Sequence, residues 1–228
     1  MEIKQQISGM PQIVIQVITA PGKFFAEMAR TGGFLPPLVF MIAMGVVTGI
    51  LQAVLGLMGL SGGMAAGMMA VILAPIVIGI FGFIGAAVLF IIWKIMGSGE
   101  SYETAYRCMA YTAAIIPITV LLQQIPYLGN IAGLAWMTWL LVLASTRVHG
   151  VAAKKAWVGF GAIAVILGLT TISLEIAGRK MVKSMQNWEQ ENQVKMDKLE
   201  KLEKMNPEEA GKALGEFLKS FDKSNEEK

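Results

Sequence analysis

Two long stretches without a charged residue constrain this chain more than any other feature of its sequence. Residues 31–93 form a run of 63 uncharged positions, and residues 108–146 form a run of 39. A bilayer core about 30 Å thick takes roughly 20 helical residues to cross, so each run predicts two membrane-spanning helices joined by a turn. A third uncharged stretch, residues 156–174, predicts one more span. We therefore expect an all-α, polytopic integral membrane protein with five transmembrane helices in the lipid bilayer.

The composition supports this class and excludes several others. Hydrophobic residues make up 55% of the chain and charged residues 15%, whereas a soluble domain carries roughly a quarter charged residues. A single cysteine excludes an internal disulfide and a cysteine-rich metal site, and a single histidine excludes a multi-histidine ligand set. We therefore expect no cofactor and no metal ion. The net charge of +3 gives no support for nucleic-acid binding.

Charges, prolines and turn residues set the limits of the spans. We place the spans at 34–60, 68–96, 106–125, 128–146 and 156–174, in a transmembrane domain at 34–176 that follows an N-terminal interfacial segment at 1–33 and precedes a charged, helical C-terminal tail at 177–228. Ser101 is a suitable cap for the third helix. Pro117 should bend that helix, because proline removes the hydrogen bond to the carbonyl group of Ala113. Gln123 and Pro126 mark the turn between the third and fourth spans.

The N-terminal segment is expected to lie in the interface plane as short amphipathic helices. We do not interpret it as a signal peptide, because Gln12 and Gln16 interrupt its apolar stretch and Pro21-Gly22 ends that stretch. The apolar residues on which the interpretation rests include Val14, Val17, Phe24, Phe25 and Met28.

Small residues recur at helical spacing in the first span, beside a polar one. Gly45, Gly49 and Gly56 would let another helix backbone approach closely. Gln52 lies on the same stripe, and we interpret it as a polar contact between helices; a place on a solute pathway is the alternative. The glycine-rich segment 61–67 is predicted to be the turn into the second span.

A polar and aromatic cluster at the start of the third span is the best candidate for a functional site. Glu103 and Arg107 are four residues apart and can pair on one helix face. Arg107 is expected to act through its position, so that lysine could replace it. Tyr106 and Tyr111 lie nearby, and anchoring at the membrane interface is the simpler interpretation of both.

Other reactive side chains are isolated in the sequence, so no catalytic set is predicted. We interpret His149 as a solvated or headgroup-facing loop residue and Cys108 as a small packing residue; a general base and a reactive thiol are the alternatives. Methionines cluster around the first outer loop at positions 58, 64, 68 and 69. Thioethers can bind Cu(I), although an apolar loop at the interface explains these residues more simply.

The distribution of cations predicts the orientation. With five spans, one side of the membrane receives Lys4, Lys23, Arg30, Lys94, Arg107, Arg147, Lys154 and Lys155, while the loops on the other side carry no cation. The positive-inside rule then places the N-terminus in the cytoplasm and the C-terminus outside, in the cell (inner) membrane. Arg179, Lys180 and Lys183 lie close to the fifth span and favour the opposite orientation.

The tail alternates lysine and glutamate in a pattern that supports a helix. An apolar stripe includes Met181, Met185 and Trp188, but Asn192 and Lys195 interrupt it, so the pattern does not firmly predict a coiled coil.

A second amphipathic helix is predicted over residues 207–221, after a turn at Asn206. A helix of this length needs an apolar surface to lie on. Three surfaces could serve. One is the upstream apolar stripe, with which the helix would form a hairpin; the others are the membrane surface, and a protein partner or second subunit.

The order and spacing of several residues resemble those of the YIP family, the Ypt-interacting proteins, which are five-span integral membrane proteins. The matching residues are Tyr106-Arg107, Ala110-Tyr111, Pro117, Pro126, Gly129, Val148-His149-Gly150 and Ala156, with the segment 19–25 before the first span. The resemblance covers residues 21–168. It implies a five-helix fold with a cytoplasmic N-terminus, which agrees with the cation pattern.

Eukaryotic members of that family are associated with prenylated Rab-type GTPases and with vesicle traffic at the endoplasmic reticulum and Golgi. This chain resembles a compact, bacterial-type member, because only residues 1–33 precede its first span and a charged tail follows its last. These departures weigh against a small-GTPase partner. We expect a non-enzymatic protein that organises the membrane or recruits partners, trafficking-like by resemblance; the alternative is a small-solute or ion transporter or a channel subunit.

Overall fold

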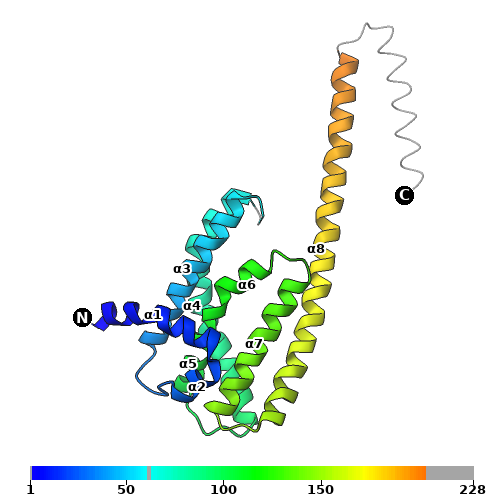
Figure 1. The fold of residues 1–228 in the computed structure, drawn as a ribbon. Coiled ribbons are helices and arrows are strands. Elements are labelled where there is room, and N and C mark those ends of the chain that lie inside the picture. Colours follow the sequence, from blue (N-terminus) through cyan, green and yellow to red (C-terminus); the bar gives the residue numbers. More distant parts are fainter. Residues whose placement is uncertain (1, 61–62, 204–228) are drawn as a thin grey trace. The chain divides into compact units, whose positions relative to one another are not determined.

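The computed structural model describes the backbone of residues 2–60 and 63–203 and the side chains of residues 8–60 and 63–197, and every regular element in that part of the chain is a helix (Figure 1). The elements are α1 (Glu2–Thr19), α2 (Pro21–Glu27), α3 (Leu35–Leu57), α4 (Gly63–Ile95), α5 (Tyr102–Thr112), the 3-10 turn η1 (Ala113–Ile115), α6 (Ile116–Leu122), α7 (Leu128–Arg147) and α8 (Ala153–Glu203). Five helical stretches in the described residues are long and apolar enough to cross a membrane. The prediction of an all-α, five-span membrane protein is confirmed.

The chain divides into two compact units, residues 1–172 and residues 173–228. The first unit contains α1 to α7 and the membrane-length part of α8. The second unit begins inside α8, which continues as one helix to Glu203. The helix predicted over 207–221 lies outside the described residues, and the domain boundary predicted at residue 177 stays a prediction.

Close contact between α3 and α4 explains the glycine stripe of the first span. A Cβ atom built on Gly45 would lie 2.5 Å from the Cα atom of Pro75, and one built on Gly49 would lie 2.6 Å from the carbonyl oxygen of Ala70. Neither position has room for a side chain, so the predicted close approach of a second helix is confirmed. Gln52 is half-buried on the same helix.

The glycine-rich turn predicted over 61–67 is wrong in its length, because α4 already begins at Gly63. A Cβ atom on Gly67 would lie 2.9 Å from both the Cα atom of Ala53 and the carbonyl oxygen of Gln52. Gly67 therefore serves the contact between α3 and α4 from within the helix. Glycine at a turn and glycine at a helix crossing look alike in sequence, which is why the turn was placed too far along the chain.

The third span is interrupted at Pro117, which is a larger change than the predicted bend. The helix α5 ends at Thr112, the 3-10 turn η1 follows, and Pro117 stands in the first turn of α6. Proline lacks an N–H group, so it suits that position, where the N–H would have no partner within the helix. The prolines at 36 and 37 occupy the first turn of α3 in the same way.

The N-terminal helices pack on the membrane domain with their apolar faces. α1 is one helix of 18 residues with Pro11 inside it, so the prediction of short pieces is wrong for this part. α1 contacts α5 and η1, and α2 contacts α7 (Figure 1). Five apolar residues of this segment are buried there: Met10, Val17, Phe24, Phe25 and Met28. Protein therefore covers the faces that the sequence assigned to the membrane interface.

Candidate functional site

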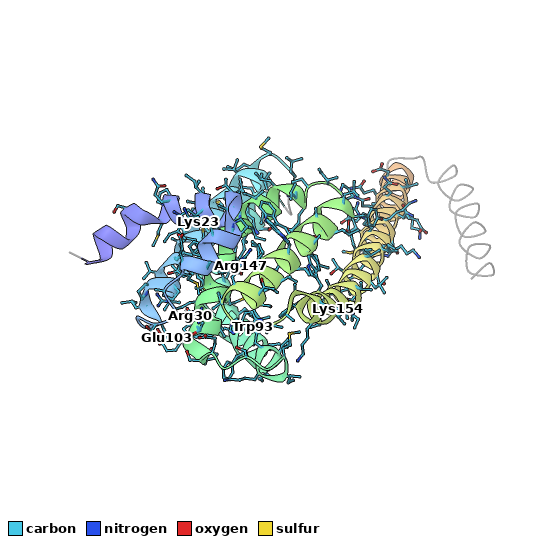
Figure 2. The ribbon with its side chains drawn as sticks, turned by 60° about the horizontal axis from the view of Figure 1, so that its bottom comes forward. Lys23, Arg30, Trp93, Glu103, Arg147 and Lys154 are labelled. Atoms are coloured by element: carbon cyan, nitrogen blue, oxygen red, sulfur yellow. The ribbon has the colours of Figure 1, made fainter. Side chains whose placement is uncertain are left out.

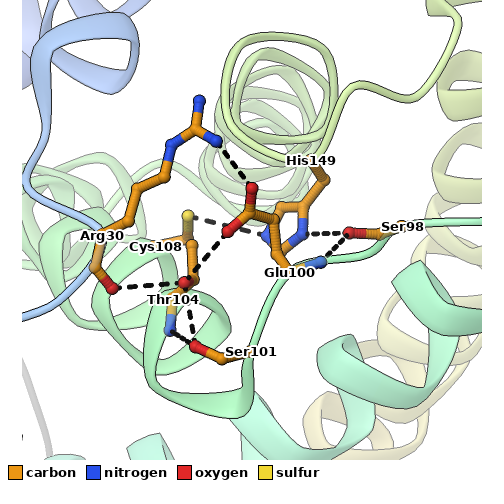
Figure 3. Close-up of polar contacts among 7 residues, drawn as sticks. All are labelled: Arg30, Ser98, Glu100, Ser101, Thr104, Cys108 and His149. Atoms are coloured by element: carbon orange, nitrogen blue, oxygen red, sulfur yellow. Dashed lines mark hydrogen bonds and ion pairs between the residues drawn. The ribbon is translucent and has the colours of Figure 1, made fainter.

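A cluster of polar side chains lies at the end of the bundle where the α2–α3, α4–α5 and α7–α8 connections meet (Figure 3). We call it the end cluster. Its members are Arg30, Ser98, Glu100, Ser101, Thr104, Cys108 and His149. Residues up to 119 positions apart in the sequence are thus brought together by three loops and the first turns of α5.

His149 is the centre of one half of the end cluster. Its ring stacks on Trp93 with 3.8 Å between ring centroids and 17° between ring planes. Its Nδ1 atom lies 2.8 Å from the Ser98 hydroxyl, and the side chain is only 5% exposed. The interpretation of His149 as a solvated or headgroup-facing residue is therefore wrong.

The environment of His149 keeps its ring neutral. Burial lowers the pKa of His149 to about 4, and the nearby cations Arg30 and Lys94 add to the effect. A neutral imidazole can stack on Trp93 without placing a charge in an apolar surrounding. Trp93 in turn donates its indole N–H to Ser145 at 2.8 Å. The stack therefore connects the end of α4 to α7 and to the loop that follows α7.

Cys108 and Ser98 stand beside His149 but are closed to solvent. The Cys108 Sγ atom is 3.8 Å from the histidine Nε2 atom, and its side chain is completely buried. This agrees with the prediction that Cys108 is a packing residue. A nucleophile paired with a base needs access to a substrate as well as a short contact, and Ser98 is only 6% exposed. As arranged, these three side chains hold loops together.

The other half of the end cluster joins α5 to the segment between α2 and α3. The Arg30 side chain forms a 2.6 Å ion pair with Glu100. The backbone carbonyl oxygen of Arg30 accepts a hydrogen bond from the Thr104 hydroxyl at 3.2 Å. Ser101 accepts the backbone N–H of Thr104 at 3.2 Å, which confirms it as the cap of α5. The first turn of α5 therefore binds the connecting segment through both side chains and backbone.

Arg107 clamps the same segment from one turn further along α5. Its Nε atom donates to the carbonyl oxygen of Ala29 at 2.7 Å, and its Nη1 atom donates to that of Gly33 at 2.8 Å. The predicted pair with Glu103 is present at 3.8 Å, and Glu103 also accepts the backbone N–H of Gly33 at 2.7 Å. The guanidinium group of Arg107 binds two carbonyl groups at once, which a lysine ammonium group cannot do in the same way. This geometry weighs against the prediction that lysine can replace Arg107.

The two tyrosines of the sequence-based cluster are core residues. Tyr106 is fully buried and stacks on Phe83 at 4.3 Å, and its hydroxyl has no hydrogen-bond partner among the described residues. Tyr111 packs edge-on against Phe24 of α2 at 5.2 Å. Their interpretation as anchors at the membrane surface does not hold, because protein surrounds both rings.

The structure unites only half of the candidate residues. Glu103, Tyr106, Arg107 and Tyr111 share α5. Four others lie elsewhere: Gln52 on α3, Pro117 at the start of α6, and Gln123 and Pro126, both exposed, in the turn between α6 and α7 at the opposite end of the bundle (Figure 1). These four form no common site with the end cluster.

The face beyond the end cluster is basic. Figure 2 shows Lys23, Arg30, Arg147 and Lys154 at this end of the first unit. Lys23, Arg147 and Lys154 are exposed and belong to α2, α7 and α8. We call these three residues the basic end face. Glu100 and Glu103 pair with Arg30 and Arg107. Glu27, which is exposed on α2 four residues after Lys23, is the acidic residue beside these three cations.

Two cavities within the first unit are lined almost entirely by apolar groups. One of about 170 Å³ lies among α3, α4, α5, η1, α6 and α7, next to Gly82 and Met109. The other, about 300 Å³, lies between α7 and α8, next to Leu134 and Gly168.

In the described residues, no group of three or more His, Cys, Asp or Glu side chains could hold a metal ion. Met58, which follows α3, and Met64, Met68 and Met69, which lie in the first turns of α4, are all exposed.

The comparison with known proteins identifies a family. A family model described as the Yip1 domain matches residues 15–174. The matched region runs from the last part of α1 into α8 and contains every residue of the end cluster. No curated protein and no solved structure matches the chain.

Proposed function

The chain belongs to the Yip1 domain family of multi-pass helical membrane proteins, and from this premise we propose that it is a non-enzymatic scaffold that recruits partner proteins to the membrane. Membrane organisation of a trafficking-like kind is the role that the family resemblance implies. The basic end face is the surface we assign to this recruitment.

The use of polar side chains at the end cluster and in the adjoining turn of α5 is the observation that carries the proposal. Ser98, Cys108 and His149 are buried and contact one another. Arg107 and Glu103 are bound to the backbone of the α2–α3 segment. Each group that could do chemistry therefore fixes a loop, whereas the exposed cations outside the cluster are left to meet a partner.

The cavities give less support to the transporter alternative. Both have almost no polar lining, whereas a pathway for a polar solute or ion needs polar or ionisable groups within the spans. Gln52, the polar residue proposed for such a pathway, lies in the glycine stripe where α3 and α4 are in close contact.

The orientation completes the proposal. The positive-inside rule favours the cytoplasmic side for the end of the bundle that carries Lys23, Arg147 and Lys154. A cell membrane with this end inside would present the basic end face to cytoplasmic proteins with acidic surfaces. Association would then be faster and tighter at low ionic strength than at high ionic strength.

In-membrane crosslinking of the full-length chain tests the proposal. The double variant Lys23→Glu/Arg147→Glu should lose the partner proteins that crosslink to the wild type. The matched control, Lys180→Glu/Lys183→Glu, changes the net charge by the same amount on α8. It should keep the partner proteins that crosslink to the wild type. The proposal is wrong if the partner set is unchanged in the first variant, or if purified protein carries a solute into sealed vesicles.

A further inference from the structure

The part of α8 in the second unit is a long helix with an exposed apolar face. It runs without a break from Ser173 to Glu203, a length of about 46 Å at 1.5 Å per residue. Two ion pairs lie within the helix: Glu175 with Arg179 at 2.9 Å and Glu191 with Lys195 at 2.8 Å. Such pairs support a helix but do not cover its apolar side chains.

The exposed apolar residues follow a heptad pattern. Leu174, Met181, Met185 and Trp188 are between 57% and 73% exposed. Met181, Met185 and Trp188 stand at successive d, a and d positions of a heptad. Leu174, the last residue of the predicted fifth span, is an earlier d position, and Gly178 stands at the a position between it and Met181. Spacings of three and four residues put these side chains on one face of the helix, and the same spacings fit the seam of two helices wound around each other.

The residue that interrupts the stripe fits the same pattern. Asn192 is the next a position, four residues after Trp188. A single asparagine at an a position of a parallel coiled coil fixes the register and the number of strands, because it pairs with its counterpart at the same height. Lys195 takes the following d position and is paired with Glu191 of its own helix, and Leu199 and Leu202 take the next a and d positions in the sequence.

We propose that this face binds the same face of a second copy of the chain and forms a parallel, two-stranded coiled coil. Every copy is held in the membrane by the same five spans, so two tails leave it on the same side, in the same direction and at the same height. That tethering raises the effective concentration of one tail for another.

The charges of the helix are compatible with self-association. Residues 173–203 contain six basic and six acidic residues, so two copies do not repel each other through net charge. The same balance makes the helix a poor ligand for an anionic lipid surface, which attracts basic helices. A second copy is therefore the occupant that the pattern and the charges both favour.

Site-directed disulfide crosslinking in native membranes tests the pairing. The only cysteine, Cys108, is fully buried and is replaced by alanine to give a background without thiols. Met185→Cys at an a position should then form a covalent dimer under mild oxidation, because equal heights meet in a parallel pair. Lys183→Cys, two residues away on the outer face, is the matched control and should stay monomeric.

Three outcomes would overturn the proposal. The first is that Met185→Cys forms no covalent dimer. The second is that Met185→Cys and Lys183→Cys form the dimer in equal amounts. The third is a dimer from Met185→Cys that appears only after residues 204–228 are deleted, which would mean that the chain's own end covers the face. Light scattering of the wild type in detergent gives an independent result. Two chains per particle, falling to one in Trp188→Asp, support the proposal, whereas one chain in the wild type contradicts it.

Discussion

Replacing Arg107 by lysine should loosen the segment between α2 and α3 even though the charge is kept. The guanidinium group donates to the carbonyl oxygens of Ala29 and Gly33 at 2.7 and 2.8 Å, and the side chain is almost fully buried. A lysine ammonium group is a compact point donor and cannot reproduce the fork that spans both carbonyl groups. One carbonyl would lose its partner in a place where little water can replace it.

The size of the effect follows from the hydrogen bonds involved. A hydrogen bond to a charged group contributes about 1.5–3 kcal/mol, and a buried acceptor left unpaired costs about 1–3 kcal/mol. We therefore expect Arg107→Lys to lower the free energy of unfolding by about 2 kcal/mol. Arg107→Leu loses both bonds and leaves Glu103 without its ion-pair partner, so it should cost about 4 kcal/mol, in the range of broken buried pairs.

Thermal unfolding of the purified protein in one detergent, combined with hydrogen exchange over residues 28–34, measures both effects. The matched control is Arg179→Lys, because Arg179 forms an exposed pair with Glu175 at 2.9 Å and should change stability by no more than about 0.5 kcal/mol. The reasoning is refuted if Arg107→Lys unfolds like the wild type, or if exchange at residues 28–34 is unchanged in Arg107→Leu.

Three further variants test other parts of the fold. Gly49→Leu places a side chain against the backbone of Ala70 and should lower the yield of folded protein sharply, whereas Gly9→Leu, at a position with open space, should not. Ser101→Ala removes the cap of α5 and should cost about 1 kcal/mol in thermal unfolding; an unchanged melting temperature would contradict the cap. Burial lowers the pKa of His149 from 6.5 to about 4, so between these values the unfolded chain takes up a proton that the folded chain resists. Stability should therefore fall as pH drops from 6.5 towards 4 and stay level above 6.5. His149→Gln should make the fall shallower, and an identical pH profile in that variant would rule out this contribution.

The membrane fold could be predicted because it depends on properties that a sequence shows directly. The uncharged runs 31–93 and 108–146 have the length of two crossings each and the stretch 156–174 that of one, and the five spans followed from them. Helix limits were less accurate where one residue type serves two purposes. Gly67 stands in α4 at a helix crossing. The glycine-rich sequence around it predicts a turn instead.

The end cluster and the neighbouring contacts of Arg107 could be predicted only in part, because most of the contacts join residues that are distant in the chain. The pair of Glu103 and Arg107 lies one helical turn apart and was visible. The bond from Arg107 to Ala29 joins residues 78 positions apart, and nothing in local spacing indicates it. His149 looked like a solvated loop residue because only the fold brings Trp93 and Ser98 to its ring.

The central claim, that the basic end face meets cytoplasmic partners, is tested most directly by the side of the membrane on which this face lies. Lys154→Cys and Met58→Cys, each in the Cys108→Ala background, place a thiol at an exposed position on either end of the first unit. A membrane-impermeant maleimide should label Met58→Cys in intact cells and Lys154→Cys only in inverted membrane vesicles. Labelling of Lys154→Cys in intact cells would contradict the account.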